Sequence, residues 1–171
     1  MPDDLEFSDL DRITVGTVGT PGRRVFLLQL RAGAETLTIK LEKQQVAAMA
    51  EALVRTLAEL NVVGDMPGDL ELEQPLEVAW VVGSMGLGYL EALDRLVLTA
   101  EEFVAVDEND VPEREPVTAR LFLTREQGAA LALRSTALVA SGRPPCPLCG
   151  HPLDPAGHTC PRKNGKTAPE R

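Results

Sequence analysis

The sequence predicts an α+β protein with a mainly antiparallel sheet and two helices on one face of it, followed by a C-terminal zinc-knuckle or ribbon-like tail. Three observations predict this class. Segments of alternating hydrophobicity come in two groups of three, each group is followed by a helical pattern, and every cysteine and histidine lies within residues 146–160. We therefore expect residues 1–142 to form a body and residues 143–171 to form the tail.

The first group of strands is expected at residues 13–18, 25–30 and 36–41. Pro21 and Gly22 predict a turn between the first two strands, because proline presets one central position of a turn and glycine accepts the other. In the third strand every second residue is apolar, which directs one face toward a core.

Residues 42–60 change to a helical period. One stripe of this helix is apolar and is expected to pack on the core; it consists of Val46, Met49, Ala50, Leu53, Leu57 and Leu60. Residues 62–77 follow as a loop with glycine and proline breakers. The acidic residues of this loop lack the regular spacing of a cation site, and we interpret the loop as a solvated linker.

The second group of strands is expected at residues 78–85, 95–99 with a continuation over 103–106, and 117–123. A polar loop at 107–116 separates the last two strands, and Trp80 is interpreted as a core anchor. The second helix is expected at 124–139, with Thr124 as its N-cap and Gly142 close to its end.

The two groups resemble each other in sequence. Residues 15–19 resemble residues 82–86, and residues 41–45, which open the first helix, resemble residues 123–127. We therefore hypothesise that 11–61 and 77–142 are duplicated strand-strand-strand-helix halves that pair into one antiparallel sheet. The similarity is short, so chance is the alternative explanation, and halves that fail to superpose would remove the hypothesis.

The tail has the ligand types and spacing of a zinc site. Cys146 and Cys149 are two residues apart, Gly150 can adopt the left-handed backbone of a tight turn, and Cys160 is a third thiolate. The fourth ligand is His158 or His151. We favour His158, because His151 lies so close to Cys149 that it would crowd the first pair.

Four protein ligands leave no position open for water, so the predicted Zn2+ is structural. A disulfide with one free thiol, a redox pair and a thiol-reactive cysteine are the alternatives. Three thiolates and a neutral imidazole leave a net charge near minus one on the site. The cationic residues placed to offset it are Arg143, Arg162, Lys163 and Lys166.

Charge separates the body from the tail. Residues 1–142 hold 12 Lys and Arg against 24 Asp and Glu, whereas residues 143–171 hold five against two. The acidic body is expected to repel nucleic-acid phosphate. The basic tail could contact nucleic acid, but it contains no aromatic residue to stack on bases, so a protein partner is favoured.

Asp3, Asp4 and Glu6 stand where a secretory signal would need basic residues, and glycines interrupt the longest apolar run, 78–90. We therefore expect a cytoplasmic protein with reduced thiols and no membrane partner.

The sequence predicts no catalytic residue, because both histidines lie in the metal motif and leave no imidazole for a nucleophile. The first hypothesis is therefore a non-enzymatic interaction or adaptor protein. The alternative is an enzyme or a binder of small molecules or anions that uses the strand-helix junctions, where a helix N-terminus can hold an anion. The junction residues are Lys40, Glu42, Lys43, Gln45, Arg125 and Glu126. A pocket between the two junctions would favour the binder.

Four segments, 16–22, 41–46, 142–150 and 157–165, resemble an actinobacterial family catalogued as domain of unknown function 3090. The resemblance covers nearly the whole chain, and the Cys-Pro-Leu-Cys-Gly and Gly-His-Thr-Cys-Pro-Arg segments of the tail are its most specific parts. The chain departs from the family pattern at residues 79–85, which lack a Phe-Arg pair before Val82. The resemblance implies a bacterial cytoplasmic protein and brings no established activity.

Overall fold

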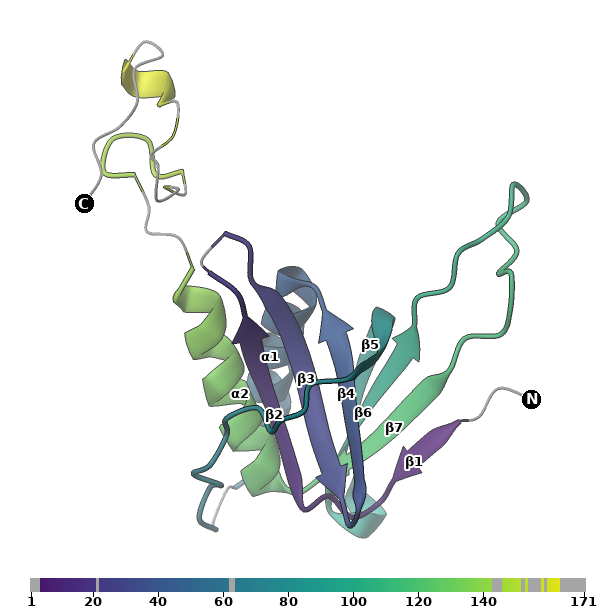
Figure 1. Cartoon of the computed structure of the whole chain (residues 1–171). Helices are drawn as coiled ribbons and strands as arrows, with labels where there is room; N and C mark the ends of the chain where they lie inside the picture. Colours follow the sequence, from purple (N-terminus) through teal and green to yellow (C-terminus); the bar gives the residue numbers. More distant parts are fainter. Residues whose placement is uncertain are drawn as a thin grey trace.

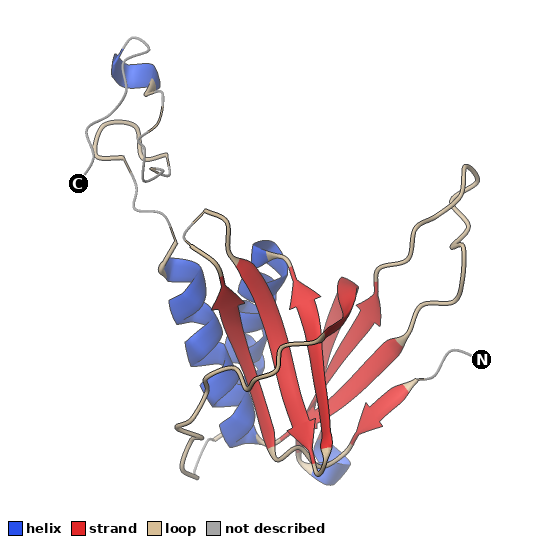
Figure 2. Cartoon of the chain, in the orientation of Figure 1, coloured by secondary structure: helices blue, strands red, loops and turns tan. Residues whose placement is uncertain are grey.

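The computed structural model describes residues 4–20, 22–61, 64–142, 146–151, 153, 158 and 160–163. Within these residues it shows an α+β fold with two α-helices and a mostly antiparallel sheet of seven strands (Figures 1 and 2). The elements are β1 (Leu5–Phe7), β2 (Arg12–Val18), β3 (Val25–Ala32), β4 (Glu35–Leu41), α1 (Lys43–Ala58), β5 (Val78–Leu90), the 3-10 helix η1 (Glu91–Leu93), β6 (Arg95–Glu102), β7 (Thr118–Leu123), α2 (Arg125–Ala140) and the 3-10 helix η2 (Pro161–Lys163).

The predicted strands and helices are confirmed, with three main differences. The strand expected at 78–85 continues to Leu90 as β5. The short strand β1 was not predicted; it pairs in parallel with β7 through Leu5 and Ala119. The predicted continuation over 103–106 is wrong, because only an isolated bridge between Val106 and Pro112 forms there. The strand order is β1-β7-β6-β5-β4-β3-β2.

Each half of the body is a strand-strand-strand-helix unit, and β5 joins the two. Its first residues, Val78–Val81, pair in parallel with β4, whereas Val82–Leu90 pair antiparallel with β6. An irregularity between Val82 and Ser84 separates the two regions. The predicted mainly antiparallel sheet is confirmed. The two halves meet through a parallel pairing of β4 with β5, and β1 adds a second parallel pairing with β7. The duplication of the halves stays a prediction.

The sheet is strongly curved. Strands β1 and β2 lie at opposite ends of the strand order, yet only residues 8–11 connect them. So short a segment spans less than about 20 Å even when fully extended. The two end strands of the sheet, β1 and β2, therefore approach each other where residues 8–11 connect them, as Figure 1 shows at the bottom of the view.

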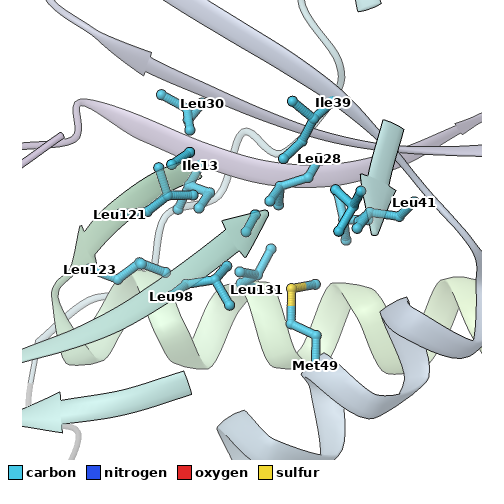
Figure 3. Close-up of a cluster of buried hydrophobic side chains, with 14 of the residues drawn as sticks. Ile13, Leu28, Leu30, Ile39, Leu41, Met49, Leu98, Leu121, Leu123 and Leu131 are labelled. Carbon is cyan, nitrogen blue, oxygen red and sulfur yellow. The ribbon is translucent and has the colours of Figure 1, made fainter. Parts of the chain in front are cut away.

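The core lies between the inner face of the curved sheet and the two helices. Side chains from both halves meet there: Leu28 of β3, Leu98 of β6, Leu121 of β7, Leu131 of α2 and Met49 of α1 (Figure 3). The buried residues of α1 are Val46, Met49, Ala50 and Leu53, as the apolar stripe predicted. Trp80 is buried in the same core, which confirms its predicted role.

The helices lie side by side in opposite directions. Arg125, the first residue of α2, donates through Nη1 to the carbonyl oxygen of Asn61, just beyond the end of α1, at 2.8 Å. At the other end Lys43, the first residue of α1, lies beside Gly142, just beyond α2. None of the helices that the structure describes combines the length and the apolar content needed to cross a lipid bilayer.

The loop before β5 is not a solvated linker along its whole length, and that interpretation is corrected. Residues 69–73, which we call the strap, lie on the outer face of β2 and β3. Thr14 donates to the carbonyl oxygen of Leu70 at 2.5 Å, and the amide of buried Gln29 exchanges hydrogen bonds with the backbone of Glu73 at 2.7 and 3.0 Å. The strap therefore closes the face of these strands that the helices leave open.

Candidate metal centre

The structure brings together the three cysteines and His158. One donor atom from each of Cys146, Cys149, His158 and Cys160 lies within 4.8 Å of the others, and this is the only such group that the described residues form. His151, the alternative fourth ligand, is exposed and does not belong to the group. The spacing argument and the geometry therefore select the same four residues.

A tight turn positions the first two thiols. The Gly150 N–H donates to the carbonyl oxygen of Cys146 at 2.9 Å, and Gly150 has a φ of 75°, which favours glycine. The Cys146 N–H donates in turn to the carbonyl oxygen of His151 at 2.7 Å. His151 therefore supports the turn through its backbone carbonyl and not through its imidazole.

A very small core surrounds the thiols. Cys146, Leu153 and Cys160 are buried, and Cys149 packs against them. Leu153 is a contact that the spacing of the motif does not reveal. The apolar side chains described here bury too little surface by themselves to offset the conformational entropy of such a segment, so a further source of stability is expected.

The pKa values of the Cys146 and Cys149 thiols are shifted in opposite directions. Burial raises the pKa of Cys146, but hydrogen bonds from the Leu148 and Cys149 backbone and from the neighbouring thiols outweigh it, and the pKa falls below its ordinary value. The His151 backbone N–H lowers the pKa of Cys149, but burial and the two neighbouring thiols outweigh it, and that pKa is raised. Backbone N–H groups directed at a thiol favour its thiolate, the form that binds metals.

His158 lies against Cys149, with 3.2 Å between its Nε2 atom and Sγ. Its Nδ1 atom is buried and has no hydrogen-bond partner among the described residues. An imidazole with one nitrogen among three thiols is a typical zinc ligand. The three cysteines are free thiols, so the disulfide alternative is not what the structure shows.

The donor set fits zinc. Zinc binds thiolate sulfur at about 2.3 Å and imidazole nitrogen at about 2.0–2.1 Å, so donors on one ion lie about 3.5–3.8 Å apart. The four donor atoms already lie within 4.8 Å of one another. Small side-chain adjustments would therefore let Cys146, Cys149, His158 and Cys160 hold the ion.

Of the four cationic residues expected to offset the charge of the site, Arg162 and Lys163 lie among the residues that the structure describes. Arg162 belongs to η2, which starts directly after Cys160, and its side chain is exposed. Lys163 ends the same turn. Arg143 and Lys166 lie outside the described residues, as do Pro21, Gly157 and Thr159 of the sequence motifs.

The junction residues do not converge on one site. At the start of α1, the Gln45 side chain accepts from the Glu42 N–H at 2.8 Å and donates to the carbonyl oxygen of Val82 at 3.1 Å. At the start of α2, Arg125 donates to Asp94 at 2.7 Å and Glu126 accepts from the Gly64 N–H at 3.1 Å.

Because the helices run in opposite directions, these two junctions lie at opposite ends of the helix pair. Lys40 and Lys43 belong to the junction at the start of α1. Gln45, Arg125 and Glu126 fix neighbouring segments through the hydrogen bonds described above. Among the described residues the two junctions therefore do not share a pocket, the arrangement that would have favoured a binder.

The chain matches the model of a known protein family. The family model described as "Protein of unknown function (DUF3090)" matches residues 5–160, a span that includes residues 5–142 of the body and all four donor residues. No curated protein and no solved structure matches the chain.

Proposed function

We propose that this chain, which belongs to the DUF3090 family, is a non-enzymatic interaction protein whose tail is held in shape by a structural Zn2+. The observation that carries the proposal is the set of four donor atoms within 4.8 Å of one another. Four protein ligands form a closed site, and closed zinc sites are structural.

The ion would supply the folding energy that the tail lacks. Among its described residues, the apolar core of the tail consists of Cys146, Leu153 and Cys160, with Cys149 packed against them. Zinc binding to small finger peptides contributes on the order of 10 kcal/mol, which is enough to order such a segment. The ion would thus act through the shape of the tail and not as a reagent.

A protein partner suits the charge distribution. The tail carries five Lys and Arg against two Asp and Glu, so it favours an acidic protein surface. The strongly acidic body disfavours long contact with nucleic acid, and the tail has no aromatic residue to stack on a base. We infer a bacterial, actinobacterial cytoplasm as the setting, because thiols stay reduced there and the tail motifs resemble that family.

Metal analysis tests the first part of the proposal. Protein purified under reducing conditions should contain one zinc per chain and show no thiol that reacts with a disulfide reagent until a chelator is added. Protein without stoichiometric metal, or with a freely reactive thiol beside a bound zinc, would contradict the structural site.

Affinity capture tests the second part. The full chain and a chain that ends at Gly142 should be used as baits in the same native cytoplasmic extract. Partners that depend on the tail should be recovered with the full chain alone, and they should be lost after the substitution Cys160→Ser. Equal partner sets for both baits would show that the tail is not the recognition element.

A further inference from the structure

The edges of a sheet are places where unpaired backbone groups can recruit another strand, and proteins commonly protect them. Two edges of this sheet are protected. At β2 the guanidinium Nε of Arg134, from α2, donates to the carbonyl oxygen of Val15 at 2.7 Å. At β1 the strand has only three residues, and Glu6 pairs with Arg120 of β7 at 3.7 Å.

Residues 84–90 of β5 form a third edge, and the described residues provide no such protection for it. Gln45 of α1 donates only to the carbonyl oxygens of Val82 and Gly83, which precede this stretch. Beyond Val82, the described strands pair with β5 only from the β6 side, because pairing with β4 ends at Val81. Residues 84–90 contain no charged residue and no proline, the two commonest devices that block added strands. All of these residues are exposed or half-buried, whereas alternate residues of β6 are fully buried.

This edge borders a groove beside α1. A cavity of about 360 Å³ lies between the helix and the strand, and its lining includes Ala48 and Ala52 of α1, Met85 of β5 and Leu98 of β6. The two alanines leave space beside the strand because their side chains are small. Arg55 also lines this groove, and its side chain is largely exposed.

We propose that the edge of β5 at residues 84–90 binds an extended segment of a partner protein as an additional strand. Main-chain hydrogen bonds to the unpaired side of β5 would supply affinity, as in other complexes formed by strand addition. The groove beside Ala48 and Ala52 is the space in which the segment lies.

The glycines of β5 define the chemistry of that segment. A Cβ atom added at Gly86 or Gly88 would have no atom within 4 Å, so this surface has open space. The cross-strand neighbours of the two glycines are Thr99 and Val97 of β6. Bulky apolar side chains at alternate positions of the bound segment can cover the glycines and contact these neighbours. The partner segment is therefore extended, without proline, and bulky and apolar at every second residue.

This edge belongs to the body, so the proposal does not depend on the metal in the tail. The substitution Cys160→Ser should abolish zinc binding and leave binding at β5 unchanged. A failure of the tail proposal and a failure of the edge proposal can therefore be told apart.

The test uses a display library of random twelve-residue peptides selected against the full chain. Selected peptides should carry bulky apolar residues at alternate positions and should protect backbone amides within residues 84–90 from hydrogen exchange. Gly86→Lys should weaken their binding at least about tenfold, because it adds a charge and fills the space over the strand. Gly68→Lys is the matched control, since that glycine also has no atom near its Cβ position.

Three outcomes would overturn the proposal. These are a selection that yields no binder, exchange protection that maps to another surface, and equal binding by the Gly86→Lys and Gly68→Lys variants. A fourth outcome would show that a second copy of this chain, and not a partner protein, occupies the edge, and would overturn the proposal in that form. In that case the chain is a dimer in solution and Gly86→Lys converts it to a monomer. Gly88→Lys repeats the test at the second glycine and guards against a fault specific to one variant.

Discussion

The Nε2 atom of His158 lies 3.2 Å from the Sγ atom of Cys149, nine residues earlier in the chain. The contact places the imidazole beside the Cys146–Cys149 pair and among the three thiols. His151 is only two residues from Cys149, yet its side chain is exposed and its backbone carbonyl accepts from the Cys146 N–H.

We therefore predict that His158→Ala loses zinc and His151→Ala keeps it. Removal of one of four ligands opens the site and weakens a metal affinity on which the fold of the tail depends. Zinc content per chain after dialysis against a weak chelator is the measurement, with both variants prepared under reducing conditions. If the two variants retain equal zinc, the assignment of the fourth ligand is wrong.

The sequence predicted most of the body because its local patterns are clear. Leu37, Ile39 and Leu41 alternate with polar residues, and all three are buried in β4. Thr124 was predicted as an N-cap, and its hydroxyl accepts from the Gln127 N–H at 3.1 Å. Such features depend on neighbours in the chain and can be recognised in a single sequence.

What the sequence could not predict depends on contacts between distant residues. Strand β1 has three residues and exists because it pairs with β7, more than 100 residues later in the chain. Gln29 reaches the strap across 44 residues, so the strap was mistaken for a linker. In the candidate metal centre the four grouped residues could be predicted from their spacing, whereas the buried Leu153 could not.

The core prediction concerns two leucines of α2. Leu131 is fully buried between the halves of the sheet and α1, whereas Leu133 is 61% exposed. Leu131→Ala should lower the free energy of unfolding by about 2–5 kcal/mol, because it leaves a cavity in a packed core. Leu133→Ala should change it by less than about 0.5 kcal/mol. Urea denaturation followed by circular dichroism measures both, and similar losses in the two variants would contradict the packing described for α2.

The strap prediction concerns Gln29. Its amide donates to Thr38 Oγ1 at 3.1 Å and to the carbonyl oxygen of Glu73 at 3.0 Å, and accepts from the Glu73 N–H at 2.7 Å. Gln29→Ala leaves these buried groups without partners, which costs about 1–3 kcal/mol. We expect lower stability and faster proteolysis within residues 69–73. Gln44→Ala, at an exposed position of α1, is the control and should change neither property. Unchanged proteolysis of the Gln29 variant would show that other contacts hold the strap.

The last prediction concerns the loop between β6 and β7. Arg114 donates to both carboxylate oxygens of Glu102, at 2.6 and 2.8 Å, and the Val117 N–H donates to the same group at 3.2 Å. The hydrogen bond from Arg114 lowers the pKa of Glu102 below its ordinary value of 4.5; burial opposes this effect, and the Val117 N–H adds to it.

A carboxyl group whose pKa is lower in the folded state than in the unfolded state stabilises the fold at pH values above its ordinary pKa. This contribution is lost as the pH falls through the pKa of the folded state. Glu102→Gln should therefore reduce the thermal midpoint at pH 7, and the difference from the unsubstituted protein should shrink as the pH falls below about 4.5. Arg114→Leu should remove most of this pH-dependent part, because it removes the largest cause of the lowered pKa and leaves only the Val117 N–H. Thermal melts at constant ionic strength measure the effect, and a difference that stays constant from pH 7 to pH 3 would contradict the role of this pair.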